Sequence, residues 1–241
     1  MKIALCVSGI AGENAKKNVE RLQQQFPTAD LYTATWRGYE DNYPVDFVFD
    51  EPEIRYHCVL DVIPYPDVES ERRINASGKN AYFAPDHGKH WNKITPHWTK
   101  QILIHNYLLT KLPDYDIIIR SRFDAVISDK IDWEHWVNTS FEDECAIGFN
   151  TRVWGYHTKV HELRDRYPKE QFNLHDALII HPRSIWDCEH IEQLHNDKKL
   201  QAAEAGWYQV LSEHPYNYFH YMYHGGVFIE KYKGHIIDYD E

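Results

Sequence analysis

The chain has 241 residues, of which 43% are hydrophobic and 15% aromatic, so it can form a packed core and is not compositionally disordered. The formal net charge is −11 and the sequence pI is about 5.8, which argues against a protein that coats nucleic acid, because such proteins are basic. No apolar run approaches the length that a membrane-spanning helix needs.

The cysteines lie far apart in the sequence and form no C-x-x-C pair: Cys6, Cys58, Cys145 and Cys188. This spacing predicts reduced, mostly buried thiols in a cytoplasmic protein. The length fits one α/β domain over residues 1–241, because no stretch is typical of a linker between domains.

The first predicted element is a buried strand over residues 3–7, which ends at Ser8-Gly9 and is followed by a helical pattern over 14–26. The apolar run is too short for a signal peptide. A strand followed by Ser-Gly, Gly12 and a helix is a common opening of a nucleotide-binding unit, because glycine lets backbone N–H groups approach a ligand. The sequence is not G-x-G-x-x-G, so a plain turn between strand and helix is the alternative.

Residues 31–36 form the second predicted strand, because they are β-branched or aromatic, and the strand ends at Trp36-Arg37. Further short strands are expected over 45–49 and 54–62, before prolines interrupt the chain.

The window 72–100 differs from the rest of the chain because it is basic and aromatic. Its cations stand against the single acid Asp86 and are interleaved with aromatic rings: Arg72, Arg73, Lys79, Lys89, Lys93 and Lys100, with Tyr82, Phe83, Trp91 and Trp98. Gly78, Pro85 and Gly88 favour loop structure over much of it, and a long loop in a compact domain is usually functional. The alternative is a solvated excursion anchored by its aromatic side chains.

Thr95-Pro96 predicts the start of a helix that ends before Pro113 and leads into the central strand, Ile117–Ile119. That strand is apolar and β-branched, and therefore reads as buried on both faces.

Arg120, Arg122 and Asp124 follow the central strand directly. Ligands bind at the carboxyl ends of strands in open α/β sheets. A carboxylate suits a divalent cation, and a guanidinium binds phosphate oxygens through two parallel hydrogen bonds, so the three side chains suit a metal-bound diphosphate. An Arg–Asp ion pair that merely caps the strand is the alternative.

The second half of the chain continues the alternation of helices and strands. A turn and short helix are expected over 129–136, strands over 145–149 and 174–181, and a charged helix over 159–167. Ser184 is the expected cap of a helix that fades by Lys199. Helical character continues over 201–211, and a last strand lies near 227–229. Together these elements predict an α/β fold with a mostly parallel central sheet flanked by helices.

Three stretches resemble small GT-A-type glycosyltransferases of bacterial surface-polysaccharide clusters and of phages: M-K-I-A-L-C-V-S-G, L-Y-T-A-T-W and Y-D-I-I-I-R-S-R-F-D. The resemblance thins out after Phe149. It implies a GT-A-like single domain that transfers a sugar from a nucleotide-sugar donor, such as a UDP-sugar, to a hydroxyl acceptor. The donor-binding residues that it implies are Ser8, Gly9, Trp36, Arg37, Gln101, Arg120 and Arg122.

The resemblance also implies a divalent cation, Mn²⁺ or Mg²⁺, held by a D-x-D motif. Here the motif reads Arg122-Phe123-Asp124, so only Asp124 carries over as a metal ligand, and strict dependence on the metal is in doubt. Arg122 then takes part of the metal's task by neutralising the leaving diphosphate. A late histidine often completes the shell, which makes His224 the candidate and His220 the reserve. The two lie four apart, so on a helix they would share a face.

Asp176 and Glu204 are the candidates for the base that takes the proton from the acceptor hydroxyl. The expected acceptor is a saccharide. A hydroxymethylated base in phage DNA is the alternative that the basic window favours and the net charge opposes. A non-catalytic nucleotide- or sugar-binding module and a metal-dependent hydrolase using His220 and His224 are rivals from other classes.

Overall fold

The computed structural model describes residues 1–52, 88–127, 129, 131–151, 177–200, 203–212 and 219–229. For 88–98, 150–151, 203–205, 208, 212 and 219–229 this description covers the backbone alone.

Four parallel strands form one half of the sheet: β1 (Ile3–Ser8), β2 (Asp30–Trp36), β3 (Phe47–Phe49) and β4 (Ile117–Ser121). Their order is β3-β2-β1-β4, so the chain builds outward from β1 on one side and then returns to place β4 on the other. The carboxyl ends of β1 and β4 therefore meet where the direction of winding changes.

The other half of the sheet is mixed. β7 (Leu178–Pro182) runs antiparallel to β4 and to β6 (Ala146–Thr151), and β8 (Phe219–Ile229) runs parallel to β6. β5 (Ala125–Ile127) closes the sheet as an antiparallel partner of β8. The full order is β3-β2-β1-β4-β7-β6-β8-β5. The predicted α/β class with a mostly parallel sheet is confirmed.

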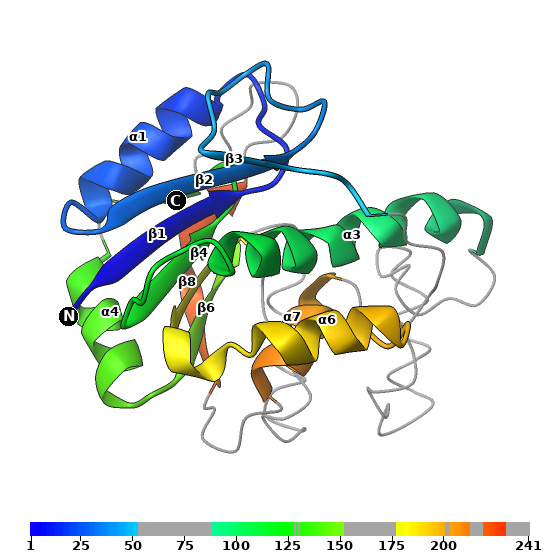
Figure 1. Cartoon of the computed structure of the whole chain (residues 1–241). Coiled ribbons are helices and arrows are strands. Elements are labelled where there is room, and N and C mark those ends of the chain that lie inside the picture. The colour runs from blue at the N-terminus through cyan, green and yellow to red at the C-terminus, as the bar shows by residue number, and fades with distance from the viewer. Residues whose placement is uncertain are drawn as a thin grey trace.

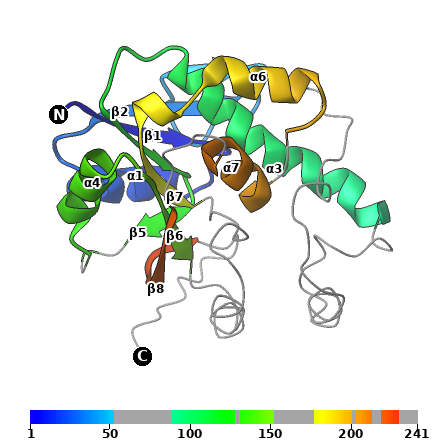
Figure 2. The ribbon, with the colours of Figure 1, turned by 90° about the horizontal axis from the view of Figure 1, so that it is seen from below.

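Helices cover both faces of this sheet (Figures 1 and 2). One face carries α1 (Ala15–Gln25) and α4 (Trp133–Glu142). The opposite face carries α3 (Gly88–Leu109), α6 (Cys188–Asn196) and α7 (Ala203–Ser212). Successive side chains of a strand point to opposite faces of the sheet. Ile117 and Ile119 therefore face α1 and α4, whereas Ile118 faces α3, α6 and α7.

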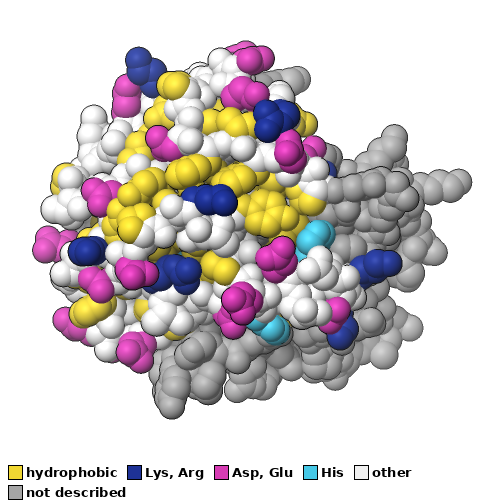
Figure 3. Space-filling model, viewed as in Figure 1, with side chains coloured by type: hydrophobic (Ala, Val, Ile, Leu, Met, Phe, Trp, Pro, Cys, Tyr) yellow, Lys and Arg dark blue, Asp and Glu magenta, His cyan; other side chains and the backbone are white. Residues whose placement is uncertain are grey.

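Half-buried aromatic side chains border the core on the face of α3: Tyr32, Tyr39, Phe47, Phe49 and Tyr107. Figure 3 shows hydrophobic side chains gathered at the centre of the view, with charged groups of both signs scattered around them.

The prediction that a helix starts at Thr95-Pro96 is wrong, since α3 begins at Gly88. The same segment was expected to be loop-rich, and its backbone over residues 88–100 is helical. Proline fits the first turn of a helix but also occurs inside one at a cost, and the local sequence does not separate these two cases.

The predicted cap at Ser184 is also wrong. Residues Arg183–Ile185 form a short 3-10 turn, and Asp187 caps α6 by accepting hydrogen bonds from the backbone N–H groups of Glu189 and His190, both at 3.0 Å. Trp186 is extended between the two elements. The carboxylate of Asp187 lies next to the first turn of α6, where the unpaired N–H groups need an acceptor.

Several predictions fall outside the described residues: the strand over 54–62, the charged helix over 159–167 and the window up to residue 87. The last strand is longer than the predicted 227–229, because β8 begins at Phe219. In the described ranges, Cys6 and Cys145 are buried free thiols and Cys188 is a partly buried one, as predicted. None of the helices in those ranges is long and apolar enough to cross a membrane.

Candidate functional site

The candidate site lies where β1 and β4 end side by side. Val7 pairs with Ser121, so the chain leaves the sheet at Ser8 on one strand and at Arg122 on its neighbour. β2 and β4 lie on opposite sides of β1, and ligands of open α/β sheets bind at such a switch point.

The end of β1 is held by hydrogen bonds to β2. The Gly9 N–H donates to the Ala34 carbonyl at 3.1 Å, and the Thr35 hydroxyl donates to the Gly9 carbonyl at 2.7 Å. Gly9 has a φ of 127°, which explains why glycine stands here. In this structure the Gly9 N–H is used within the sheet, and the role of Gly9 in donor binding stays a prediction.

Ser8 contributes a buried hydroxyl to the same strand end. Its side chain is fully buried, and its Oγ has no hydrogen-bond partner among the described residues. Residues 4, 6 and 8 of β1 share one face, and Cys6 pairs with Arg120 across the strands, so Ser8 and Arg120 lie on the same face of the sheet. A buried hydroxyl without a partner is costly in the absence of a ligand.

Arg120 is fully buried between two helices. Its Nη2 donates to Oε1 of Gln101 on α3 at 3.1 Å, and its guanidinium carbon lies 4.6 Å from the ring centroid of Trp207 on α7. A cation over an indole face is attracted by the ring quadrupole, which offsets part of the cost of burying the charge. The structure thus brings together Gln101 and Arg120, both predicted donor-binding residues.

Arg122 and Asp124 form a bidentate ion pair just beyond the end of β4. The Arg122 Nε donates to Oδ1 of Asp124 at 2.7 Å and its Nη2 donates to Oδ2 at 2.6 Å. The two side chains are 24% and 33% exposed, so the pair is open to a ligand. The ion pair considered as the alternative is present, and it stands at the switch point rather than away from it.

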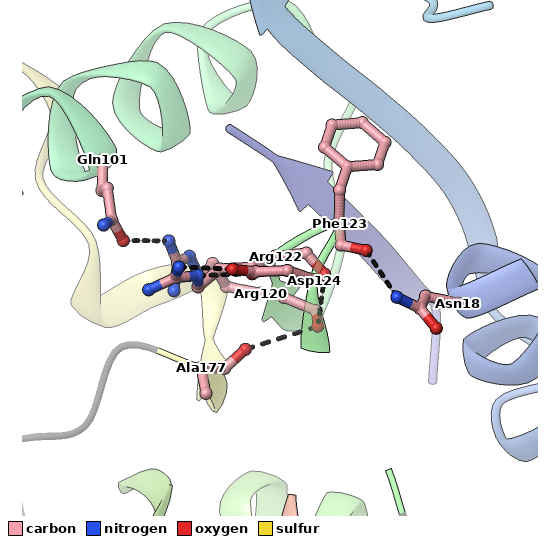
Figure 4. Close-up of polar contacts among 8 residues, drawn as sticks. Asn18, Gln101, Arg120, Arg122, Phe123, Asp124 and Ala177 are labelled. Carbon is pink, nitrogen blue, oxygen red and sulfur yellow. Dashed lines mark hydrogen bonds and ion pairs between the residues drawn. The ribbon is translucent and has the colours of Figure 1, made fainter. Parts of the chain in front are cut away.

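Phe123, between these two residues, points to the opposite face of the sheet (Figure 4). Its ring packs against Tyr43 with centroids 5.5 Å apart, and its carbonyl accepts from Nδ2 of Asn18 at 3.0 Å. Asn18 was missed by the sequence reasoning. Its signal is a polar residue on the apolar face of α1, beside the buried Val19 and Leu22.

Two buried histidines lie near Arg120 and were also missed. The His181 Nδ1–H donates to the Pro182 carbonyl at 2.8 Å, which leaves Nε2 of His181 to accept from Nε2–H of His105 at 3.4 Å. Burial lowers the pKa of both rings, to about 4 for His181, and Arg120 and Arg183 lower that of His105 further. Both imidazoles are therefore neutral near pH 7.

Two other predicted donor-binding residues, Trp36 and Arg37, follow one another at the end of β2. Trp36 is 3% exposed and packs edge-on against Tyr107, so its ring belongs to the core. Arg37 is 65% exposed and donates to Asp50 at 2.6 Å.

The remaining candidates are described by their backbone alone or not at all. Asp176 lies outside the described residues, and Glu204 lies in the first turn of α7. His220 and His224 lie on strand β8, not on a helix, and the register with β6 shifts between Met222 and Val227.

His224 lies on β8, where Ile229 pairs with Ala125, the residue after Asp124. The role of His224 as a metal ligand stays a prediction. Asp124 is the only acid of the Arg122-Phe123-Asp124 motif, and its two oxygens accept from Arg122. Within the described ranges, no group of three His, Cys, Asp or Glu side chains is placed to hold a metal ion. At the end of β4, the described side chains therefore offer a divalent cation only the carboxylate of Asp124, which already pairs with Arg122.

No protein-family model matches the chain, and no curated protein sequence matches it. Some solved structures do match the chain. One is a glycosyltransferase involved in the glycosylation of the major capsid of PBCV-1, 12% identical, with 91% of this chain and 82% of that chain covered at a TM-score of 0.39. Another is the galactosyltransferase LgtC in complex with donor and acceptor sugar analogs, 11% identical, with 88% and 70% covered at a TM-score of 0.37.

A third structure, of an active-site mutant of LgtC, is 9% identical, with 91% of this chain and 72% of that chain covered at a TM-score of 0.41. The reported solved structures that the chain resembles are thus all glycosyltransferases.

Proposed function

We propose that the chain is a glycosyltransferase that moves a sugar from a nucleotide-sugar donor to a hydroxyl group of a saccharide acceptor, on a single domain. The observation that carries this proposal is the set of charges at the β1–β4 switch point. Arg120 is buried there, Arg122 and Asp124 follow it, and the buried hydroxyl of Ser8 faces the same side of the sheet as Arg120. A cationic strand end of this kind suits the diphosphate of a nucleotide sugar.

In the transfer, the bond between the anomeric carbon and the diphosphate oxygen breaks, and a bond from the acceptor oxygen to that carbon forms. Negative charge develops on the leaving diphosphate, and the guanidinium groups of Arg120 and Arg122 stabilise it. Their positions are set in advance by Gln101 and Asp124 respectively, so little reorganisation is needed when the charge develops. Asp176 and Glu204 remain the predicted bases for the proton of the acceptor hydroxyl.

A saccharide is the proposed acceptor rather than a hydroxymethylated base in DNA. Lys100, a cation of the basic window, pairs with Glu51 at 2.8 Å and is 12% exposed, so it is already neutralised within the fold. The net charge of −11 also opposes approach of a long polyanion.

The test is release of nucleoside diphosphate from a panel of UDP-, GDP-, CDP- and dTDP-sugars, with and without short saccharide acceptors. We expect one donor class to be turned over and Asp124→Asn to lower the rate at least about 100-fold, the scale seen when a preorganised charge-stabilising group is lost. Circular dichroism should show that the Asp124→Asn variant is folded. Binding of a nucleotide sugar without any turnover, with every acceptor tried, contradicts the transferase and favours a binding module.

A further inference from the structure

The charge at the end of β4 differs from that of a site built to hold a metal. Two guanidinium groups and one carboxylate, those of Arg120, Arg122 and Asp124, leave one formal positive charge at this strand end. A pair of acids would leave two negative charges and would need a divalent cation before a diphosphate is attracted. The present set attracts a diphosphate directly.

The geometry of the ion pair also disfavours a metal at Asp124. Both carboxylate oxygens accept from Arg122, at 2.7 and 2.6 Å, so the edge that a chelating cation would use is occupied. A divalent cation binds such oxygens at roughly 2.0–2.6 Å, so it would lie within a few ångströms of the guanidinium charge. That repulsion has no compensation from a second carboxylate in the motif.

The backbone that carries the pair is fixed from the other side of the sheet. Asn18 of α1 donates to the Phe123 carbonyl at 3.0 Å, and the Phe123 ring is 1% exposed in the core. Arg122 and Asp124 therefore project from an anchored segment toward the side opposite the Phe123 ring (Figure 4). A guanidinium held in this way keeps its orientation without a metal.

We propose that the donor site works without a divalent cation, with Arg122 as the charge that meets the diphosphate and Asp124 as the positioning residue that orients Arg122. This inference rests on the proposed function, because it concerns the same donor site. The bond changes are those of the transfer itself, and the negative charge of the departing diphosphate is met by Arg120 and Arg122.

The experiment compares nucleoside diphosphate binding in EDTA and in Mn²⁺, by calorimetry, with UDP, GDP, CDP and dTDP as probes. Wild-type affinity should agree within about twofold between the two conditions. Arg122→Gln should weaken binding about 10- to 100-fold in both, the range expected for a lost hydrogen bond to a charged group. Arg122→Asp, which restores an acidic pair around Phe123, should lose binding in EDTA and regain at least about tenfold in Mn²⁺.

Lys199→Asp is the matched control. Lys199 pairs with an acid two residues away, Asp197, at 3.6 Å, as Arg122 does with Asp124, but it lies on an exposed turn after α6. Its substitution creates the same acid spacing without the strand end. Mn²⁺ binding in the absence of nucleotide, followed by electron paramagnetic resonance, should appear in Arg122→Asp and be absent from wild type and Lys199→Asp.

Wild-type nucleotide binding that disappears in EDTA and returns with Mn²⁺ would overturn this inference and leave the proposed function standing. Unchanged affinity in Arg122→Gln would also overturn it. Absence of binding to every probe in both conditions would overturn the proposed donor site and this inference together. Because Arg122→Gln adds no charge, it tests the role of Arg122 even if Arg122→Asp fails to fold.

Discussion

The two faces of the central sheet bury different kinds of side chain. The face under α1 and α4 is filled by aliphatic and aromatic groups, among them Leu5, Ile117 and Ile119. The face under α3, α6 and α7 holds a comparable apolar cluster but also buries the cation Arg120 and two neutral imidazoles, those of His105 and His181. Arg120 and His181 are alternate residues of β4 and β7, strands that supply both faces, whereas His105 comes from α3.

This contrast indicates that one face serves mainly stability and the other also serves the site. A buried charge rarely stabilises a fold by itself, because its desolvation costs as much as its contacts return. Arg120 is held by Gln101 and by the ring of Trp207, and it lies on the strand that ends at the candidate site. We therefore expect substitutions on the first face to change unfolding, and substitutions around Arg120 to change binding.

The largest expected effect is on the apolar face. Ile119→Ala should lower the free energy of unfolding by about 2–5 kcal/mol, because the side chain is fully buried and leaves a cavity. Urea unfolding measures it, with exposed Lys111→Ala as the control, which should change by less than about 0.5 kcal/mol. The nucleotide affinity of the folded Ile119→Ala protein should be unchanged. A loss of affinity in this variant would contradict the assignment of stability to one face and binding to the other.

The buried histidines should make stability depend on pH. The pKa of His181 is lowered to about 4, mainly by burial, whereas the unfolded value is 6.5, so the unfolded chain binds the proton first. Stability from this group is complete above pH 6.5 and is lost as the pH falls toward 4, by about 3 kcal/mol. His181→Asn should reduce the slope of unfolding free energy against pH over this window. The exposed His135→Asn should leave it unchanged, and equal slopes in all three proteins would contradict the assignment.

Arg120→Met tests the purpose of the buried cation. Nucleoside diphosphate affinity should fall about 10- to 100-fold, because a charge-assisted contact is lost. The free energy of unfolding should stay equal or rise, since a flexible apolar chain of similar length replaces a buried charge. Calorimetry and urea unfolding measure the two quantities. A large loss of stability with unchanged affinity would make Arg120 a structural residue.

The smallest effect is expected for Gln101→Met, which removes the hydrogen bond to Arg120 but keeps the helix and most of the volume. Gln101 orients Arg120, whose charge stays in place in this variant, so affinity should fall less than in Arg120→Met, roughly two- to tenfold. A loss as large as that of Arg120→Met would mean that Gln101 contacts the ligand itself.

Local composition was sufficient to predict most strands and several helices. The β-branched run Ile117–Ile119 and the aromatic run ending at Trp36 lie in β4 and β2 as expected. The errors fall at boundaries, at Thr95-Pro96 and Ser184, where a good local start signal competed with a helix that began elsewhere. A terminus depends on which backbone groups the rest of the fold leaves unpaired, and the local sequence does not contain that information.

The candidate site shows the same limit. Arg120, Arg122 and Asp124 were identified from their position after a buried strand. Arg122 and Asp124 do follow that strand, whereas Arg120 lies within it, because β4 extends to Ser121. Asn18, His105 and His181 were not identified, because each is a single polar residue whose partner lies 76 to 105 positions away in the chain. His224 lies on β8, which pairs with β5 directly after Asp124, and its role as a metal ligand stays a prediction.

The sequence by itself determined that a buried strand ends in two arginines and one acid, because hydrophobic periodicity and charge are properties of neighbouring residues. Only the tertiary structure decided that Arg120 lies between α3 and α7 and that Ser8 leaves the sheet beside the end of β4. These arrangements depend on strand order and register, which are set by packing between segments far apart in the chain.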